Sequence, residues 1–287
     1  MKNKKPIPDD MSPTQSDVFT DEEIDILLND LQEKFGCDFT DYARASVRRR
    51  ISRLFLLDKF ASFADFRNRL TRNDRYITRF VQEVTVNVTE MFRDPTFYRL
   101  LREKVLPVLA THPFIRIWHA GCSTGEEVYS MAILLKEANL LNKSLLYATD
   151  INPEVLAQVA RGIYPLGAIK QYSENYILAG GKEDFSSYYT AKYDLAKFDD
   201  ELKSKMIVST HNLVSDRSFN QFQLIICRNV LIYFNKRLQD KVFALFDASL
   251  ERHGFLGLGA KEQIKFSDVG RKYQQLDAKE KIWKKMT

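Results

Sequence analysis

The segment Ile115–Glu127 contains the residue types with the clearest chemical meaning in this sequence. It begins with an apolar run typical of a buried strand, continues through a short loop of small residues, and ends in two carboxylates where a helix should start. Gly121 and Gly125 let a backbone approach a ligand where a Cβ atom would clash. Carboxylates in a first helical turn interact favourably with the helix dipole. The segment therefore predicts a loop that binds a nucleotide-like cofactor.

The acidic end of this loop narrows the class of cofactor. Glu126 and Glu127 would repel a pyrophosphate, whereas they suit an amine, a ribose or a cationic group. The loop also lacks the G-x-G-x-x-G pattern of dinucleotide-binding folds. S-adenosylmethionine (SAM), a sulfonium compound with an amino group, suits the loop better than a dinucleotide does.

A further acidic residue follows the next predicted strand. Residues 144–150 are mostly apolar and end in Asp150, while Asn152 and Pro153 suit the cap and first position of another helix. In α/β nucleotide-binding folds, an acidic residue at the end of the second strand holds ribose hydroxyls. Asp150 could instead only cap the turn. The two acidic signals in consecutive strand–loop–helix units favour the cofactor interpretation.

The composition is typical of a globular protein without a membrane segment. The chain has 287 residues, 45% of them apolar, and a net charge of +5. No uninterrupted apolar run approaches the roughly 20 residues of a membrane span, and no apolar signal core follows the charged start. The three cysteines lie far apart without metal-ligand spacing. We therefore expect reduced thiols, no metal site and a cytoplasmic location.

The order of the predicted elements divides the chain into four parts. Residues 1–19 are polar with three prolines and are expected to form a disordered leader. Residues 20–85 should form a small all-helical domain, and residues 86–114 should link it to the C-terminal part of the chain. Residues 115–287 alternate strands and helices, which indicates an α/β domain. A polar stretch at about 165–206 interrupts this pattern and indicates an inserted subdomain, which could be a small β-structure.

Apolar periodicity and capping signals predict the individual elements. Thr20 and Glu23 form a capping box before the first amphipathic helix. Further helices are expected over 42–57, 62–70, 74–84, 93–105, 153–161 and 236–250. Further strands are expected over 205–210, 222–227 and 254–258, with a closing antiparallel hairpin over 273–276 and 281–285.

The carboxyl ends of the predicted strands gather the candidate ligand-binding residues. Ligands of doubly wound sheets lie outside these ends, which here carry Ala120–Glu127, Asp150, His211–Leu213 and Cys227–Asn229. The amides of Asn212 and Asn229 suit an adenine edge or an amino-acid carboxylate, although each alone is more often a turn residue. Tyr233, four residues after Asn229, could lie on the rim of the site or pack in the core.

Five motifs, in this order, resemble those of the CheR-type methyltransferases. They are Val86–Arg93, Trp118–Glu127, Ala148–Asp150, His211–Leu213 and Cys227–Phe234. Members of that family are SAM-dependent enzymes that esterify glutamate side chains of bacterial chemoreceptors, and the match runs from about residue 20 to the C-terminus. The resemblance implies an α/β fold with a Rossmann-like SAM-dependent methyltransferase sheet, a small all-helical N-terminal domain and an inserted subdomain.

The resemblance also implies which residues form the site. SAM contacts are expected at Asn87, Thr89, Arg93, Glu127, Asp150, Asn212, Leu213, Arg228 and Asn229. Arg93 and Tyr233 match family positions close to the transferred methyl group and are the expected catalytic residues. One departure is Gly259–Ala–Lys–Glu262, where many members carry a hydroxyl residue in place of Lys261.

The expected partner is a methyl-accepting receptor or receptor-like protein with acidic helices. The basic residues Arg44, Arg48 and Arg49 lie within one helical turn of each other, with Arg53 further along that side. They would suit an acidic substrate helix, and a solvated basic face is the alternative. We expect a monomer that binds no nucleic acid and does not insert into a membrane.

Three other functions compete with glutamate methylation. DNA or RNA amino-methyltransferases carry an Asn/Asp–Pro–Pro–aromatic motif after the fourth strand, whereas Arg228–Asn–Val–Leu follows here. A methyltransferase acting on a non-receptor protein would share every motif. A SAM-binding signalling scaffold that has lost turnover is the non-enzymatic alternative.

Overall fold

The computed structural model describes residues 18–35, 38–85 and 89–287. The chain divides into two compact units, Met1–Val86 and Asn87–Thr287, which we call the helical unit and the α/β unit. Nearly all of the expected leader, residues 1–19, lies outside the described residues, as does Cys37.

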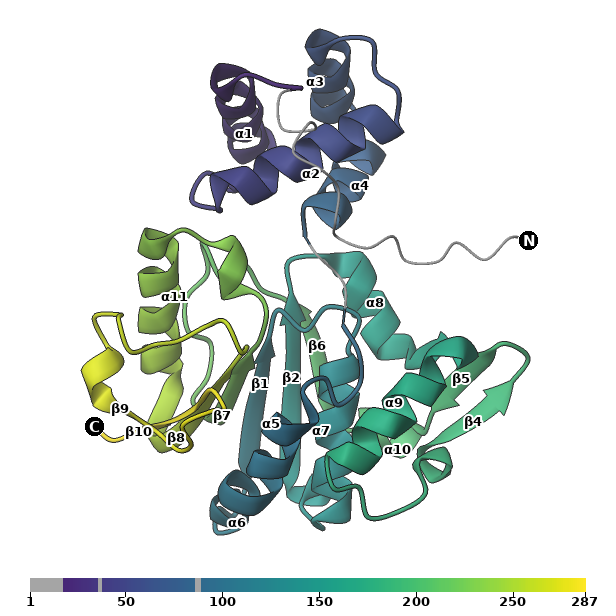
Figure 1. Ribbon diagram of the computed structural model, residues 1–287, viewed down its shortest axis with the longest axis vertical. Coiled ribbons are helices and arrows are strands. Elements are labelled where there is room, and N and C mark those ends of the chain that lie inside the picture. The colour runs from purple at the N-terminus through teal and green to yellow at the C-terminus, as the bar shows by residue number, and fades with distance from the viewer. Residues whose placement is uncertain (1–17, 36–37, 86–88) are drawn as a thin grey trace. The chain divides into compact units, whose positions relative to one another are not determined.

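The described part of the helical unit contains the helices that the sequence predicted. They are α1 (Asp21–Phe35), α2 (Arg44–Leu57), α3 (Phe63–Arg72) and α4 (Asp74–Val84) (Figure 1). The predicted capping box is confirmed, since the Glu23 amide donates to Thr20 Oγ1 at 3.2 Å and the Thr20 amide donates to Glu23 Oε2 at 2.9 Å. The side chains of Ser62 and Asn73 cap α3 and α4 by accepting from the amides of Asp65 and Tyr76. Local sequence therefore sets where these helices begin.

An apolar, largely aromatic core holds these helices together. Phe66 is fully buried, and its ring centroid lies 5.1 Å from that of Phe60 and 5.8 Å from that of Phe55. The amphipathic stripe of α1 is buried with it: Ile24, Leu27, Leu28 and Leu31. Burial of such side chains is the main stabilising contribution to a small helical domain.

A seven-stranded sheet forms the centre of the α/β unit, in the order β6-β2-β1-β7-β8-β10-β9. Its strands are β1 (Ile115–Ala120), β2 (Ser144–Asp150), β6 (Met206–Thr210), β7 (Phe222–Cys227), β8 (Leu250–Leu258), β9 (Tyr273–Gln275) and β10 (Ile282–Lys285). Neighbouring strands from β6 to β8 are parallel, and β9 and β10 form the predicted antiparallel hairpin. The winding reverses direction between β1 and β7, which makes this a doubly wound sheet.

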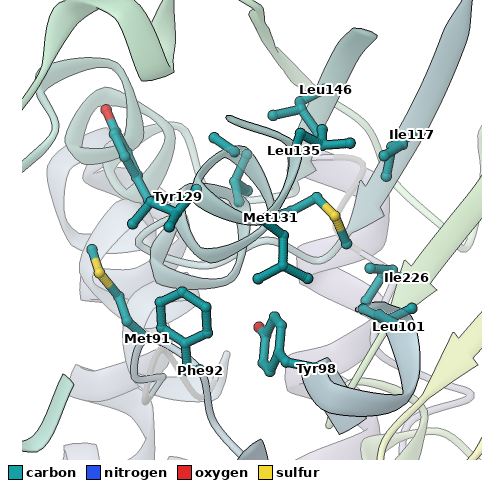
Figure 2. Packing of buried hydrophobic residues seen from close by; sticks show 14 of the residues in the cluster. Met91, Phe92, Tyr98, Leu101, Ile117, Tyr129, Met131, Leu135, Leu146 and Ile226 are labelled. Carbon is teal, nitrogen blue, oxygen red and sulfur yellow. The ribbon is translucent and has the colours of Figure 1, made fainter. Parts of the chain in front are cut away.

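Alternation along β1 separates the two faces of the sheet. Ile117 belongs to a cluster with Met131 and Leu135 of α7 (Glu126–Glu137), as Figure 2 shows. Trp118 lies on the opposite face, where its ring centroid is 5.5 Å from that of Phe246 in α11 (Lys236–Ser249). Because side chains alternate along a strand, one apolar strand contributes to both layers of helices.

The predicted linking helix runs further than expected. It begins as α5 (Pro95–Leu100), continues as a π-helical turn over Leu101–Val105, and ends as α6 (Leu106–Leu109). The sequence pattern predicted an end at residue 105. The helix continues because Leu106 and Leu109 are also buried in the core of the α/β unit.

Between α8 (Pro153–Arg161) and β6, the chain forms a separate three-stranded antiparallel sheet in the order β3-β5-β4. Its elements are β3 (Ile163–Pro165), α9 (Leu166–Leu178), β4 (Tyr189–Lys192), β5 (Leu195–Phe198) and α10 (Asp200–Lys203). We call residues 163–203 the insertion. It is anchored on Glu137 at the end of α7, which accepts hydrogen bonds from Tyr176 and Tyr188 and pairs with Arg102.

Short 3-10 turns complete the described chain at Leu141–Lys143, Phe185–Tyr188, Leu231–Tyr233 and Gly270–Lys272. Among the described helices, none combines the length and the apolar character that a membrane crossing requires.

Candidate active site

Four neighbouring parallel strands end at one edge of the sheet, and their loops carry most of the predicted site residues. The order is β6, β2, β1, β7, with Ala120 opposite Thr149 and Asp150 opposite Thr210. Since parallel strands share a direction, the segments after Ala120, Asp150, Thr210 and Cys227 lie next to one another. The strand order therefore brings together residues separated by more than 100 positions in the sequence.

The loop after β1 is tied to the end of β2. The amides of Gly121 and Cys122 donate to the Thr149 carbonyl at 2.8 and 2.9 Å. Gly121 has a φ of +74°, and a Cβ atom there would lie only 2.6 Å from Val230 Cγ2 in the loop after β7. Gly121 is thus required by contact with a neighbouring loop, in addition to any contact with a ligand.

Asp150 is bonded to two loops at once. Its Oδ1 accepts from the Asn152 amide at 3.0 Å, and its Oδ2 accepts from the Ser123 amide at 2.9 Å. Asp150 therefore does cap the turn after β2, as one interpretation of the sequence held. Burial raises the pKa of this carboxyl group, although the backbone amides counteract part of that rise. Each carboxylate oxygen can accept a second hydrogen bond, so a ribose hydroxyl could still be bound.

The two glutamates at the start of α7 have different surroundings. Glu126 is buried, and it accepts from Thr124 Oγ1 at 2.6 Å and from the Tyr172 hydroxyl at 3.2 Å. Burial raises the pKa of Glu126. Glu127 is less enclosed, and its Oε1 lies 2.9 Å from Nδ1 of the fully buried His119 on β1. Of these two glutamates, Glu127 is therefore the one that keeps a partly exposed carboxylate at the strand ends.

Arg93 lies in a turn with an unusual backbone. Its neighbours Phe92 and Asp94 have φ angles of +53° and +57°. Positive φ is unfavourable for side chains other than glycine, above all for a bulky one such as Phe92. The Phe92 amide donates to Ser130 Oγ on α7 at 2.9 Å. Surrounding contacts thus hold a strained turn whose central residue is Arg93.

Arg228 connects this turn to the rest of the site. The Arg228 side chain is 3% exposed. Its Nη2 atom donates to Asp94 Oδ2 at 2.5 Å and to the Arg93 carbonyl at 3.0 Å. Nη1 lies 3.6 Å from Glu127 Oε2, and the guanidinium stacks 4.2 Å from the Phe97 ring centroid. Arg228 therefore binds protein groups from three segments, a role that its motif did not reveal.

A residue outside the predicted set shapes the loop after β7. Glu262 is buried. Its Oε2 atom accepts from the amides of Gly259 at 2.7 Å and Asn229 at 3.1 Å. Its Oε1 atom accepts from the amide of Ile232 at 3.3 Å. Burial raises the pKa of Glu262. The motif Gly259–Glu262 stood out in the sequence for Lys261, which is exposed. The substituted lysine therefore leaves the Glu262 hydrogen bonds intact.

Most of the remaining predicted residues lie on the same loops, Thr89 lies on the segment before Arg93, and one residue is outside the described residues. Asn212 forms a turn in which its Oδ1 accepts from the Val214 amide at 2.9 Å, and Leu213 is buried. Asn229 has a φ of +61°, so it too is a turn residue. Tyr233 is half-buried in the turn Leu231–Tyr233, which is not the environment of a packed core tyrosine. Thr89 is half-buried, and Asn87 is not among the described residues.

The arginines of α2 are only partly available. Arg44 Nη1 lies 2.5 Å from Asp25 Oδ1, and Arg48 pairs with Asp21, both on α1. Arg53 Nη1 lies 3.6 Å from Glu83 Oε2, whereas Arg49 is exposed. The basic stripe is therefore largely neutralised within the helical unit.

Several buried polar atoms at the strand ends have no hydrogen-bond partner within the described chain. They are His119 Nε2, Ser123 Oγ, Asn152 Nδ2, His211 Nδ1 and Arg228 Nε. Buried polar groups are normally hydrogen-bonded. These five lie on adjoining strand ends and loops, where they could bind a polar ligand, whereas other buried atoms without a partner, such as Ser52 Oγ and Trp283 Nε1, lie elsewhere.

Comparison with known proteins identifies the family. Residues 87–282 match the family described as CheR methyltransferase, SAM binding domain, and residues 22–85 match CheR methyltransferase, all-alpha domain. The chain belongs to the CheR methyltransferase family. The resemblance seen in the sequence motifs is thereby confirmed, together with the expected fold class and SAM as the cofactor.

Relatives of this CheR-family protein come from several bacteria. It is 43% identical to "Putative methyltransferase Cher3" of Pseudomonas putida, over 93% of this chain and 97% of that protein. It is 32% identical to "Chemotaxis protein methyltransferase 1" of Vibrio cholerae, over 86% of this chain and 91% of that protein. It is 30% identical to "Chemotaxis protein methyltransferase" of Borreliella burgdorferi, over 86% and 89% of the two chains.

The groups at the strand ends fit SAM. Glu127 and Asp150 supply acidic groups for a cationic cofactor with ribose hydroxyls, and Asn212 and Asn229 supply amides. The buried atoms without partners add unused hydrogen-bonding capacity on the same segments. The α/β unit is thus the SAM-binding part of a SAM-dependent methyltransferase.

Proposed function

We propose that this enzyme methylates glutamate side-chain carboxylates of a chemoreceptor or a receptor-like signalling protein. The products would be a glutamate methyl ester and S-adenosyl-L-homocysteine. The relatives named chemotaxis protein methyltransferases support this substrate class. The observation that carries the proposal is the strained turn that holds Arg93, since a cation on a braced backbone suits the orientation of a carboxylate.

The cofactor is held, in this proposal, by the loops at the strand ends. Asp150 binds the ribose and Glu127 the cationic end, while Asn212, Leu213 and Asn229 surround the remaining groups, and Asn87, Thr89 and Arg93 act from the preceding segment. Arg228 contributes mainly by fixing Asp94 and Glu127, because its Nη atoms already bind protein groups.

Alignment is the main task of the catalytic residues. When bound, SAM supplies an activated methyl group, which passes from sulfur to a substrate carboxylate oxygen without the transfer of a proton. A glutamate is ionised at neutral pH, so no strong general base is needed. Arg93 orients the incoming carboxylate and Tyr233 fixes the other side. Correct alignment of two reactants lowers a barrier by about 7–11 kcal/mol in favourable cases.

The basic helix α2 is proposed to bind the acidic substrate, with its four arginines contributing unequally. Arg49 is exposed and needs no rearrangement. Arg44 and Arg48 would have to exchange Asp25 and Asp21 for substrate carboxylates, and Arg53 would have to leave Glu83. We therefore expect Arg49→Ala to weaken substrate binding more than Arg44→Ala does.

Methyl-labelled SAM tests the proposed reaction directly. The enzyme is incubated with the membrane fraction of the host, and labelled protein is treated with mild base. Release of the label as methanol is expected, because methyl esters hydrolyse in base. Base-stable label would indicate N-methylation and contradict the proposal. Labelling of soluble proteins alone would indicate a non-receptor substrate, and SAM binding without any labelling would favour a scaffold.

A further inference from the structure

Asn175 on the insertion contacts the segment that carries Arg93. Asn175 is 6% exposed on α9, and its Nδ2 donates to the Met91 carbonyl at 3.0 Å, across 84 positions of the sequence. Gln171, one turn earlier on α9, donates to Asn175 Oδ1 at 3.0 Å and so defines which way the amide faces. Met91 and Phe92 are both fully buried, and Figure 2 shows them beside the core of the α/β unit.

The turn around Arg93 is held at three points. The Met91 carbonyl is held by Asn175, the Phe92 amide by Ser130, and the Arg93 carbonyl by Arg228. Because Phe92 and Asp94 both have positive φ, the turn would relax if its contacts were lost. Loss of Asn175 would also leave the Met91 carbonyl buried without a partner, which is unfavourable.

The insertion makes further hydrogen bonds to the loop after β1 and to the start of α7. The Tyr172 hydroxyl on α9 donates to Glu126, and the Tyr164 hydroxyl on β3 donates to the Thr124 carbonyl at 2.9 Å. The insertion is thus bonded both to the loop after β1 and to the Arg93 turn. Ser130 joins the same two regions, because its hydroxyl donates to the Glu126 carbonyl at 2.7 Å.

We propose that Asn175 is a positioning residue for methyl transfer, and that it acts by holding the backbone of the Arg93 turn from the insertion. The inference rests on the proposed role of Arg93 in the reaction. The insertion would then support the active site by holding the backbone beside Arg93. Asn175 acts through Arg93 and has no contact of its own with the reacting atoms.

Asn175→Leu is the decisive variant, because leucine has a similar volume and no donor. With host membranes and saturating methyl-labelled SAM, we expect the initial rate of base-labile labelling to fall about tenfold to a hundredfold, the effect of a small misplacement of a catalytic group. The matched control is Glu174→Leu, which makes the same replacement by leucine at the preceding, exposed position of α9. The control should stay within about twofold of the parent rate.

Two further measurements separate positioning from general destabilisation. Hydrogen exchange in peptides covering residues 89–94 should accelerate in Asn175→Leu and stay unchanged in Glu174→Leu. In an Arg93→Ala background, Asn175→Leu should cause no additional loss of rate, because residues that act through one another are not additive.

The outcomes distinguish this inference from the proposed function. If Arg93→Ala lowers the rate but Asn175→Leu does not, or if the two losses multiply, the positioning role is overturned and the role of Arg93 remains. If Arg93→Ala leaves the rate unchanged, the catalytic assignment of Arg93 fails, and the positioning role fails with it. Unchanged exchange at residues 89–94 in Asn175→Leu would also overturn the positioning role.

Discussion

The two units of this protein use buried polar groups in opposite ways. In the described part of the helical unit, the buried polar side chains are Asp30 and Ser52, and the core is otherwise apolar and aromatic. The α/β unit buries many more, among them Glu126 at the start of α7, Asp150 at the end of β2, and Arg228 and Glu262 in the segments after β7 and β8. The core of the helical unit packs helices together. In the α/β unit, buried polar groups also hold the backbones of loops in place.

The pKa values of the buried carboxyl groups depend on their partners: burial would raise those of Glu137 and Asp247 in the α/β unit, but hydrogen bonds and nearby cations lower them. A hydrogen bond from Arg67 is the main cause that lowers the pKa of Asp30, so its ionised form stabilises the helical unit. Burial raises the pKa of Glu126, Asp150 and Glu262, whose charges are held mostly by hydrogen bonds from protein groups. A buried carboxylate without a close cation is destabilising, and its retention at the strand ends is consistent with a role in binding.

The largest effect is expected from the core of the helical unit. Phe66→Ala should lower the free energy of unfolding by about 3–5 kcal/mol, the usual cost of removing a buried phenylalanine. Denaturant unfolding of the whole chain measures this, with the exposed Leu57→Ala on α2 as a control within about 0.5 kcal/mol. SAM affinity, measured by calorimetry where the protein stays folded, should not change. A parallel loss of affinity would contradict the division between the units.

Arg93→Ala should have the next largest effect, on turnover and not on stability. We expect about a hundredfold slower labelling, equivalent to about 2.7 kcal/mol, and a smaller loss for Tyr233→Phe. Arg271→Ala, which removes an exposed arginine of the turn Gly270–Lys272, is the matched control and should leave the rate unchanged. Unchanged turnover in both Arg93→Ala and Tyr233→Phe would refute the proposed alignment mechanism.

Glu262→Gln tests whether the buried carboxylate of Glu262 contributes to the binding of SAM. The amide nitrogen cannot accept from the backbone, so at least one of the bonds to Gly259, Asn229 or Ile232 is lost. We expect SAM affinity to fall about tenfold, or about 1.4 kcal/mol. Lys261→Thr introduces the hydroxyl that the resemblance to the family implied at this position and should bind SAM as the parent does. Equal affinity for Glu262→Gln and the parent would show that this loop needs no carboxylate.

The smallest effect concerns the ion pair in the helical unit. Because the pKa of Asp30 is lower in the folded state, its contribution to stability is present above the unfolded pKa of about 3.9 and disappears as pH falls through the folded value. Asp30→Asn should therefore be less stable than the parent at pH 7, and the difference should be smaller at about pH 2. The difference should be modest, since Arg67 is open to solvent. Thermal unfolding at both pH values measures it, and a difference that persists unchanged in acid would exclude ionisation as its source.

Local sequence patterns predicted most of the elements. The strands Ser144–Asp150 and Phe222–Cys227 appear with the predicted bounds, as do the helices at 74–84 and 153–161. These elements are marked by apolar periodicity and by caps such as Asn152, both of which depend on residues within a few positions. The end of the linking helix was placed wrongly, at residue 105, because Leu106 and Leu109 continue it through contacts with the distant sheet.

The candidate site was predicted by motif, but not the way its residues are held. Arg228 was expected to contact the cofactor, and its bonds to Asp94 and the Arg93 carbonyl were not foreseen. Glu262 lay within a recognised motif, yet its three backbone donors could not be foreseen. Asn175 had no signal in the sequence at all.

The sequence by itself therefore determined the succession of strands and helices along the chain, the acidic loop after Ile115–Ala120 and the family motifs. Only the tertiary structure decided the partners of buried polar groups, such as the contact between Asn175 and Met91. The physical reason is that periodicity and capping act along a few consecutive residues, whereas a buried donor bonds to whatever group the strand order brings beside it. Which strands become neighbours is a property of the whole chain.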